Sequence, residues 1–124
     1  MPTRTKIYFD GGARPNPGPM ETAVVVGGVA QVCRDLGRGG SMEAEWLALL
    51  QALEIARTLA PAEVILLGDA AAVIAQAAGT AKCPRACAAH KRTFDALGGD
   101  RVRLRYVRRA QNLAGIALAR HHPR

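Results

Sequence analysis

The order of apolar segments along the chain predicts an α/β fold, a five-stranded mixed sheet flanked by helices. Residues 5–10, TKIYFD, are apolar on both faces, which is typical of a central buried strand. Residues 42–59 repeat apolar side chains at helical spacing: Trp46, Leu49, Leu50, Leu53 and Ala56. The next segment, PAEVILLGD, indicates a second buried strand that ends in a carboxylate. A chain of 124 residues without a repeat or a linker is expected to form one domain, residues 1–124.

Turn residues divide the N-terminal part into further elements. The segment 11–19, GGARPNPGP, is too rich in glycine and proline for regular structure and is expected to be a shaped loop. Residues 22–29 and about 30–37 predict two strands joined by a tight turn that contains glycine. With the first strand they would form an antiparallel meander. GRGG then interrupts the chain before the long helix, for which Ser41 is the expected N-cap.

The C-terminal part supplies the remaining helices and strand. We expect short helices at about 70–78 and 84–97. Residues 101–107, RVRLRYV, alternate arginine with Val, Leu and Tyr, which predicts a strand with arginines in water and apolar side chains inside. A last helix at about 112–120 completes the order βββαβααβα.

Three acidic residues from distant segments are expected to meet at one edge of the sheet. Because a strand–helix–strand connection is normally parallel, the strands ending at Asp10 and Asp69 place both carboxylates at the edge where open α/β sheets bind ligands. Glu45 lies one turn before Leu49, on the apolar side of the long helix, so it points toward the sheet. Carboxylates this close need compensation, which a cation such as Mg²⁺ usually supplies. Each acid alone has a structural explanation: Asp10 could start a turn, Glu45 could complement the helix dipole, and Asp69 could cap the next helix. The prediction therefore depends on all three together.

Four segments resemble the ribonuclease H family, and together they cover almost the whole chain. IYFDGGARPNPGP is similar to the family's opening strand and loop, and MEAEWLALLQALEIA to its first helix. VILLGDAAAVIAQ resembles the next strand and helix, and RLRYVRRAQNLAGIALAR is a degraded version of the C-terminal segment. The resemblance implies a ribonuclease H-like sheet with strand order 3-2-1-4-5. It also implies that Asp10, Glu45 and Asp69 are catalytic and bind metal.

The resemblance further implies a reaction and a substrate. The family hydrolyses the RNA strand of RNA/DNA hybrids endonucleolytically with Mg²⁺ or Mn²⁺, using two ions when substrate is bound. Asn16 would contact RNA 2′-hydroxyl groups, which distinguish RNA from DNA. Gly11 and Gly12 would permit close approach to substrate, although a purely conformational need explains them equally well. Ser41 and Asn112 are further candidates for substrate binding.

The chain departs from the family pattern at the fourth catalytic acid. That acid is expected four residues after Asn112, where this chain has Ile116, which offers no ligand. Asn112 could supply a weak carbonyl oxygen, and His121 or His122 could reach the site, although terminal histidines are usually solvated. Ala70 replaces a frequent serine of the family. These changes predict attenuated activity, and they leave open a non-catalytic module that binds hybrids or duplexes. A third and weaker interpretation, another nuclease or recombinase of this fold, is disfavoured by the Asn-Pro-Gly loop.

Basic charge is concentrated in the C-terminal part. The net charge is +7, but residues 1–80 hold six Lys/Arg against eight Asp/Glu, whereas residues 81–124 hold eleven against two. This asymmetry predicts a surface that faces a polyanion, with a solubilising face as an equal alternative. The same two interpretations apply to a modestly basic predicted helix that carries Lys82, Arg85, Lys91 and Arg92.

The three cysteines predict reduced thiols, because Cys33, Cys83 and Cys87 show no framework spacing. Cys83, Cys87 and His90 could share one helical face, but no fourth zinc ligand is evident, so we expect small core residues there. No apolar run reaches the length of a membrane span, and no secretory signal is seen. We therefore expect a cytoplasmic protein without a membrane anchor or an obligate protein partner.

Overall fold

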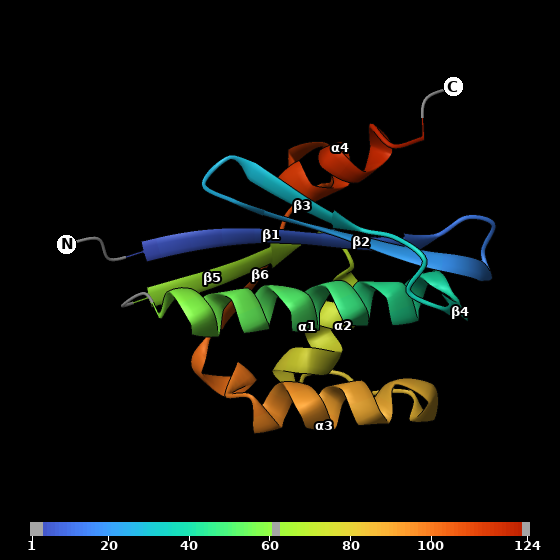
Figure 1. Ribbon diagram of the computed structural model, residues 1–124. Helices are drawn as coiled ribbons and strands as arrows, with labels where there is room; N and C mark the ends of the chain where they lie inside the picture. Colours follow the sequence, from blue (N-terminus) through green and yellow to red (C-terminus); the bar gives the residue numbers. More distant parts are fainter. Residues whose placement is uncertain (1–3, 61–62, 123–124) are drawn as a thin grey trace.

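One mixed sheet organises the chain, with α1, α2 and α3 on one face and α4 on the other (Figure 1). The computed structural model describes residues 4–60 and 63–122. The strands are β1 (Arg4–Ala13), β2 (Gly18–Val26), β3 (Val29–Cys33), β4 (Arg38–Gly39), β5 (Glu63–Gly68) and β6 (Arg103–Tyr106). The helices are α1 (Ser41–Leu59), α2 (Ala71–Ala78), α3 (Ala88–Ala96) and α4 (Leu113–Ala119), with 3-10 turns η1 (Arg85–Cys87), η2 (Gly99–Arg101) and η3 (Arg109–Gln111).

The sheet order is β3-β2-β1-β5-β6, which confirms the predicted topology. β1 pairs antiparallel with β2 and β2 with β3, whereas β1–β5 and β5–β6 are parallel. A sixth strand, the two-residue β4, pairs with β2 where the sequence predicted only a break. The parallel pairing of β1 and β5 is what brings their carboxyl ends to one edge.

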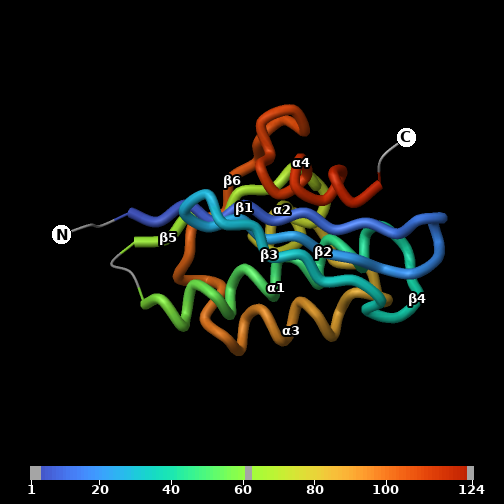
Figure 2. The backbone as a smooth tube through the Cα atoms, turned by 45° about the horizontal axis from the view of Figure 1, so that its top comes forward, coloured from blue at the N-terminus to red at the C-terminus, as the bar shows by residue number. Residues whose placement is uncertain are grey.

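The larger core lies between the sheet and α1, α2 and α3. Phe9, Trp46 and Phe94 have essentially no exposed surface there, and the Trp46 and Phe94 rings meet edge to face with centroids 6.1 Å apart. Trp46 Nε1 donates a hydrogen bond to Gln76 Oε1 over 2.9 Å, which ties α1 to α2. Figure 2 shows α1 and α3 running side by side on this face, and α4 on the opposite one. No helix within the described ranges is long and apolar enough to cross a membrane.

Two predicted strand boundaries are wrong, because glycine can occupy a strand as well as a turn. β1 continues through Gly11 and Gly12, and its pairing with β2 extends to Ala13 opposite Met20. The irregular loop is therefore shorter than the predicted segment 11–19. The tight turn lies at residues 27–28, both glycines with positive φ, so it falls inside the strand predicted at 22–29.

The helix starts also differ from the predictions. Ser41 is the first residue of α1 and not its N-cap; Gly40 is the N-cap, and Asn16 Oδ1 accepts a hydrogen bond from the Ser41 backbone N–H at 3.1 Å. The helix predicted at 84–97 is divided into η1 and α3. Tyr106, predicted to face inward, is 54% exposed, so that part of the prediction for the last strand is wrong.

Candidate active site

Asp10, Glu45 and Asp69 come together at the carboxyl edge of the sheet, as the sequence predicted. Asp10 lies on β1, Asp69 directly follows β5, and Glu45 projects from the second turn of α1. One carboxylate oxygen from each residue lies within 4.8 Å of the other two. This is the only group of three possible ligand residues so close together in the part of the chain that the structure describes.

Gly11 allows α1 to approach β1 closely enough for Glu45 to reach this edge. A Cβ at Gly11 would lie 2.1 Å from the carbonyl oxygen of Ala44, so no other residue fits without a shift of the helix. The Gly11 N–H also donates a hydrogen bond to Glu45 Oε1 over 3.1 Å. Gly11 thus positions Glu45, and close packing of α1 on β1, not approach to substrate, explains this glycine. A Cβ at Gly12, in contrast, would meet nothing within 4 Å.

Asn112 is a buried part of the site whose amide is engaged by protein groups, which argues against the predicted contact with substrate. Its side chain has no exposed surface. Asn112 Nδ2 donates to the carbonyl oxygen of Phe9 at 2.9 Å and to Asp69 Oδ2 at 3.3 Å, and Oδ1 accepts from the Ala114 N–H as the N-cap of α4. One buried amide therefore joins β1, Asp69 and the last helix.

The electrostatics of the three acids favour a bound cation. Burial, reinforced by the charge of Asp69, raises the pKa of Asp10 to about 6, although a Glu45 hydrogen bond and the cations Arg109 and Arg14 oppose the rise. Burial and the charges of Asp10 and Asp69 raise the pKa of Glu45 to about 9, against the effect of the Gly11 N–H. Three close oxygen donors fit a hard divalent cation, which would stabilise the charged forms of Asp10 and Glu45.

A cleft of about 450 Å³ opens in front of the carboxylates. Arg14 from the β1–β2 loop and Arg109 from η3 line it, so cations flank the acidic centre. Ser41 and Ile116 are also in the lining, and Ile116 is 40% exposed. The position at which the resemblance led us to expect a fourth acid therefore lies at this cleft, and the apolar side chain of Ile116 occupies it.

Comparison with known proteins identifies the family. A family model described as "Reverse transcriptase-like" matches residues 21–122. RNase H1 from the halophilic archaeon Halobacterium salinarum NRC-1 is 28% identical, with a TM-score of 0.80 and 93% of each chain covered. The chain belongs to the ribonuclease H family. None of the curated proteins that were compared with it gives a match.

Two further ribonuclease H structures share this fold. The N-terminal RNase H domain of a Mycobacterium tuberculosis protein is 26% identical, with a TM-score of 0.78 over 98% of this chain and 100% of that one. LC11-RNase H1, isolated from compost by a metagenomic approach, was solved in complex with an RNA/DNA hybrid. It is 27% identical, with a TM-score of 0.76 and 88% of each chain covered. The predicted ribonuclease H-like fold is confirmed.

The residues predicted to recognise substrate lie in the loop and at the start of α1. Asn16 is exposed, and its Oδ1 holds the Ser41 N–H, so the loop and the helix start are joined at the rim of the cleft. Gly12 faces open space in the cleft lining. Contact of Asn16, Gly12 or Ser41 with RNA stays a prediction.

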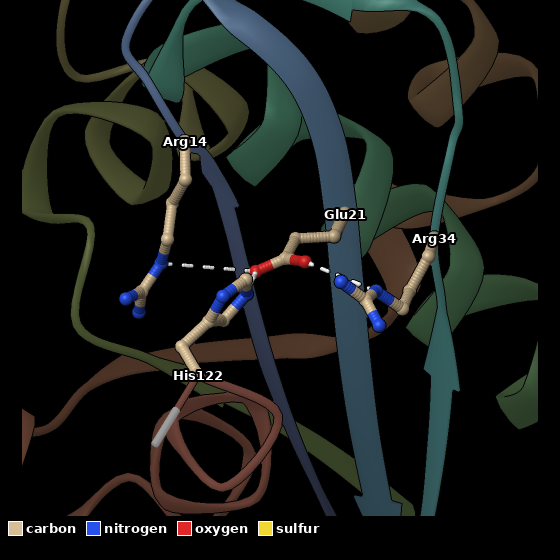
Figure 3. Close-up of polar contacts among 4 residues, drawn as sticks. All are labelled: Arg14, Glu21, Arg34 and His122. Carbon is tan, nitrogen blue, oxygen red and sulfur yellow. Dashed lines mark hydrogen bonds and ion pairs between the residues drawn. The ribbon is translucent and has the colours of Figure 1, made fainter. Parts of the chain in front are cut away.

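Figure 3 shows a charged cluster that sequence reasoning missed, and one of its members, Arg14, also lines the cleft. The Glu21 side chain is only 7% exposed, yet Arg14, Arg34 and His122 surround its carboxylate. Arg14 Nε lies 3.8 Å from Oε2, Arg34 Nε lies 3.6 Å from Oε1, and His122 Nε2 contacts Oε2. The expectation that His122 is simply solvated is therefore wrong. Alternation along β2 places Glu21 on the same face of the sheet as Ala23, which pairs with Asp10, but the sequence does not show that three cationic side chains reach Glu21.

The cysteine and histidine residues near α3 do not gather as a zinc site in the described part of the chain. Cys87 is buried as expected, and burial raises the pKa of its thiol, helped by nearby Cys83 and Glu43. Cys83 precedes η1 and is partly exposed, so it does not share the helical face of the others. His90 Nε2 lies 3.1 Å from Glu43 Oε2, which gives this histidine a structural partner.

Proposed function

We propose that this protein hydrolyses the RNA strand of RNA/DNA hybrids endonucleolytically, in a reaction that depends on divalent cations. The observation that carries the proposal is the carboxylate triad, with oxygens within 4.8 Å of one another at the base of an open cleft. The structural likeness to LC11-RNase H1, which was solved with an RNA/DNA hybrid, supports this substrate class. The cations Arg14 and Arg109 beside the triad suit a polyanionic substrate.

Asp10, Glu45 and Asp69 would hold Mg²⁺ or Mn²⁺, two ions when substrate is bound, because their oxygens form the only such cluster in the described residues. When bound, such ions supply an activated water and stabilise the charge that develops at the phosphate. The protein's own contribution is positioning. Gly11 fixes Glu45 through its N–H, and Asn112 fixes Asp69 through its amide. Asn16, in the exposed loop, would contact 2′-hydroxyl groups.

Ile116 is the reason to expect a slow enzyme. It lines the cleft where the family has its fourth acid, so one side of the cation site lacks a protein oxygen. Asn112 does not compensate, because its carbonyl oxygen caps α4. The same observation favours the second candidate, a hybrid-binding module that has lost catalysis. Retention of three mutually repelling acids favours the enzyme.

The decisive experiment incubates the purified protein with an end-labelled RNA/DNA hybrid and either Mg²⁺ or Mn²⁺. We expect cleavage of the RNA strand that leaves 5′-phosphate and 3′-hydroxyl ends. An Asp10→Asn variant should lose at least about 100-fold in rate, because it loses a charged ligand. Wild-type cleavage no faster than the Asp10→Asn control, combined with hybrid binding by both, would establish the non-catalytic alternative.

A further inference from the structure

We propose that Arg14 and Arg34, held on the buried carboxylate of Glu21, form a phosphate-binding site for the nucleic-acid strand next to the catalytic cleft. The ligand class is a phosphodiester backbone. The inference rests on the proposed function for the identity of the substrate, but it requires binding only and not cleavage. Glu21 is a positioning residue in this site, and the two arginines make the contacts.

The donors of both arginines remain available. The Glu21 side chain is 7% exposed, whereas those of Arg14 and Arg34 are 54% and 53% exposed. Both guanidinium groups approach Glu21 through Nε at 3.8 and 3.6 Å, which is ion-pair distance but longer than a hydrogen bond. Neither guanidinium donates a hydrogen bond to any residue in the described ranges. Each therefore offers its fork of N–H groups, the geometry that binds phosphate in pairs.

The charge of the cluster exceeds what Glu21 needs. One cation is enough to compensate a buried carboxylate, yet two guanidinium groups and His122 meet here from three separate segments (Figure 3). Two exposed arginines near one carboxylate leave a net positive charge at the surface. Without Glu21 the two cations would repel each other, so the buried carboxylate is what holds them together. The excess charge points to an anionic ligand.

The cluster lies in register with the catalytic acids. Asp10 pairs with Ala23 and Gly12 pairs with Glu21 across β1 and β2, so Asp10 and Glu21 are on the same face of the sheet, one alternate position apart. Gly12 lies between them without a side chain, and a Cβ there would meet nothing within 4 Å. Arg14 itself lines the cleft. A strand with one phosphate at the triad would thus place its next phosphates over Gly12, toward Arg14 and Arg34.

The alternative is that Glu21 has only a structural role, in which its ion pairs hold together the β1–β2 loop, the end of β3 and the end of α4. Binding of a fluorescent 12-base-pair RNA/DNA hybrid, measured by anisotropy at several KCl concentrations, separates the two. Every variant carries Asp10→Asn, which suppresses cleavage. Arg34→Gln is compared with Arg57→Gln, which removes the same charge from the exposed last turn of α1, at the other end of the helix from Glu45.

We expect Arg34→Gln to bind the hybrid roughly fivefold more weakly and to lower the slope of log K against log[salt] by about one. Arg57→Gln should leave both quantities unchanged. Equal effects of the two variants would show that only overall charge matters, and would overturn the site. If neither the Asp10→Asn parent nor any variant binds the hybrid, the proposed function itself fails. This outcome is distinct from failure of the arginine site alone.

Glu21→Gln gives a test of opposite sign. Loss of a negative charge near the substrate would by itself tighten binding to a polyanion. If Glu21 positions the arginines, Glu21→Gln instead weakens binding, despite the more positive protein. The measurement is made below the melting temperature of the variant. If Glu21→Gln does not fold, the comparison of Arg34→Gln with Arg57→Gln decides alone. Tighter or unchanged binding by folded Glu21→Gln would contradict the positioning role.

Discussion

The two faces of the sheet are built for different purposes. The face under α1, α2 and α3 carries large side chains packed without exposed surface, among them Phe9, Trp46 and Phe94. The face under α4 carries a small cluster: Ala23, Val25, Ala114 and Leu118. α4 packs mainly against β1 and β2, with smaller contacts to β3 and η3. The first face supplies most of the buried apolar area that stabilises the fold, and the thinly covered second face leaves the cleft and the side chains of Arg14 and Arg34 accessible.

Two adjacent glycines show this difference most directly. Gly11 faces α1, and its missing Cβ is required because the Ala44 carbonyl oxygen occupies that space. Gly12 faces the cleft, and its missing Cβ leaves an open surface. Neither has a positive φ, so packing and not backbone conformation separates them. Substitutions at these two positions should therefore affect different properties.

Gly11→Ala is expected to have the largest effect on the fold. The added methyl group would force α1 away from β1, with an overpacking cost of about 3 kcal/mol in the free energy of unfolding. Activity should fall as well, because the Gly11 N–H holds Glu45. Chemical denaturation followed by circular dichroism measures the change. A Gly11→Ala protein as stable as wild type would show that this face tolerates expansion and that the comparison is wrong.

The sequence predicted the fold and the acids because these depend on local patterns. Hydrophobic period and turn residues gave the element order, and parallel pairing then placed Asp10 and Asp69 together. The cluster at Glu21 depends on side chains that arrive from positions 14, 34 and 122, and no local pattern reports such a meeting. The sequence did not reveal the burial of Asn112 for the same reason, because its partners Phe9 and Asp69 are remote in sequence.

The next largest expected effect is a dependence of stability on pH. It arises at the catalytic carboxylates, where Glu45 from α1 on one face of the sheet meets Asp10 on the other. Folding raises the pKa of Glu45 and Asp10, so the folded protein holds protons more tightly than the unfolded chain. The metal-free protein should therefore lose stability as pH rises from about 4 to about 9, because ionising these buried carboxyl groups costs more in the folded protein than in the unfolded chain. Mg²⁺ or Mn²⁺ should raise the melting temperature more at pH 8.5 than at pH 5.5.

Glu45→Gln is the control for this prediction, because glutamine keeps an oxygen for the Gly11 N–H but does not titrate. The variant should show a flatter dependence of melting temperature on pH and a smaller stabilisation by the cation. An identical pH profile in wild type and Glu45→Gln would mean that the acids at this edge do not limit stability.

Ile116→Asp tests whether the cation site in the cleft lacks only one protein ligand. The side chain lines the cleft, so a carboxylate there could complete the cation site. We expect cleavage to accelerate about tenfold, equivalent to about 1.4 kcal/mol in the barrier, while the metal-free protein becomes less stable through added repulsion. Ile116→Asn has similar volume and no charge and should give neither change. Equal rates for Ile116→Asp and wild type would show that the missing acid is not what limits the reaction.

Gly12→Ala is expected to have the smallest effect. Whereas Gly11→Ala should lower the free energy of unfolding, Gly12→Ala should not. The methyl group enters open space, so the free energy of unfolding should be unchanged or rise by about 0.5 kcal/mol through the loss of unfolded-chain freedom. Hybrid binding should nevertheless weaken about threefold, because the methyl group stands between Asp10 and Glu21, where the strand would pass. Anisotropy and thermal melting of the same preparation measure both quantities. Undiminished binding would show that the backbone takes another path, and would remove the link between the triad and the arginines on Glu21.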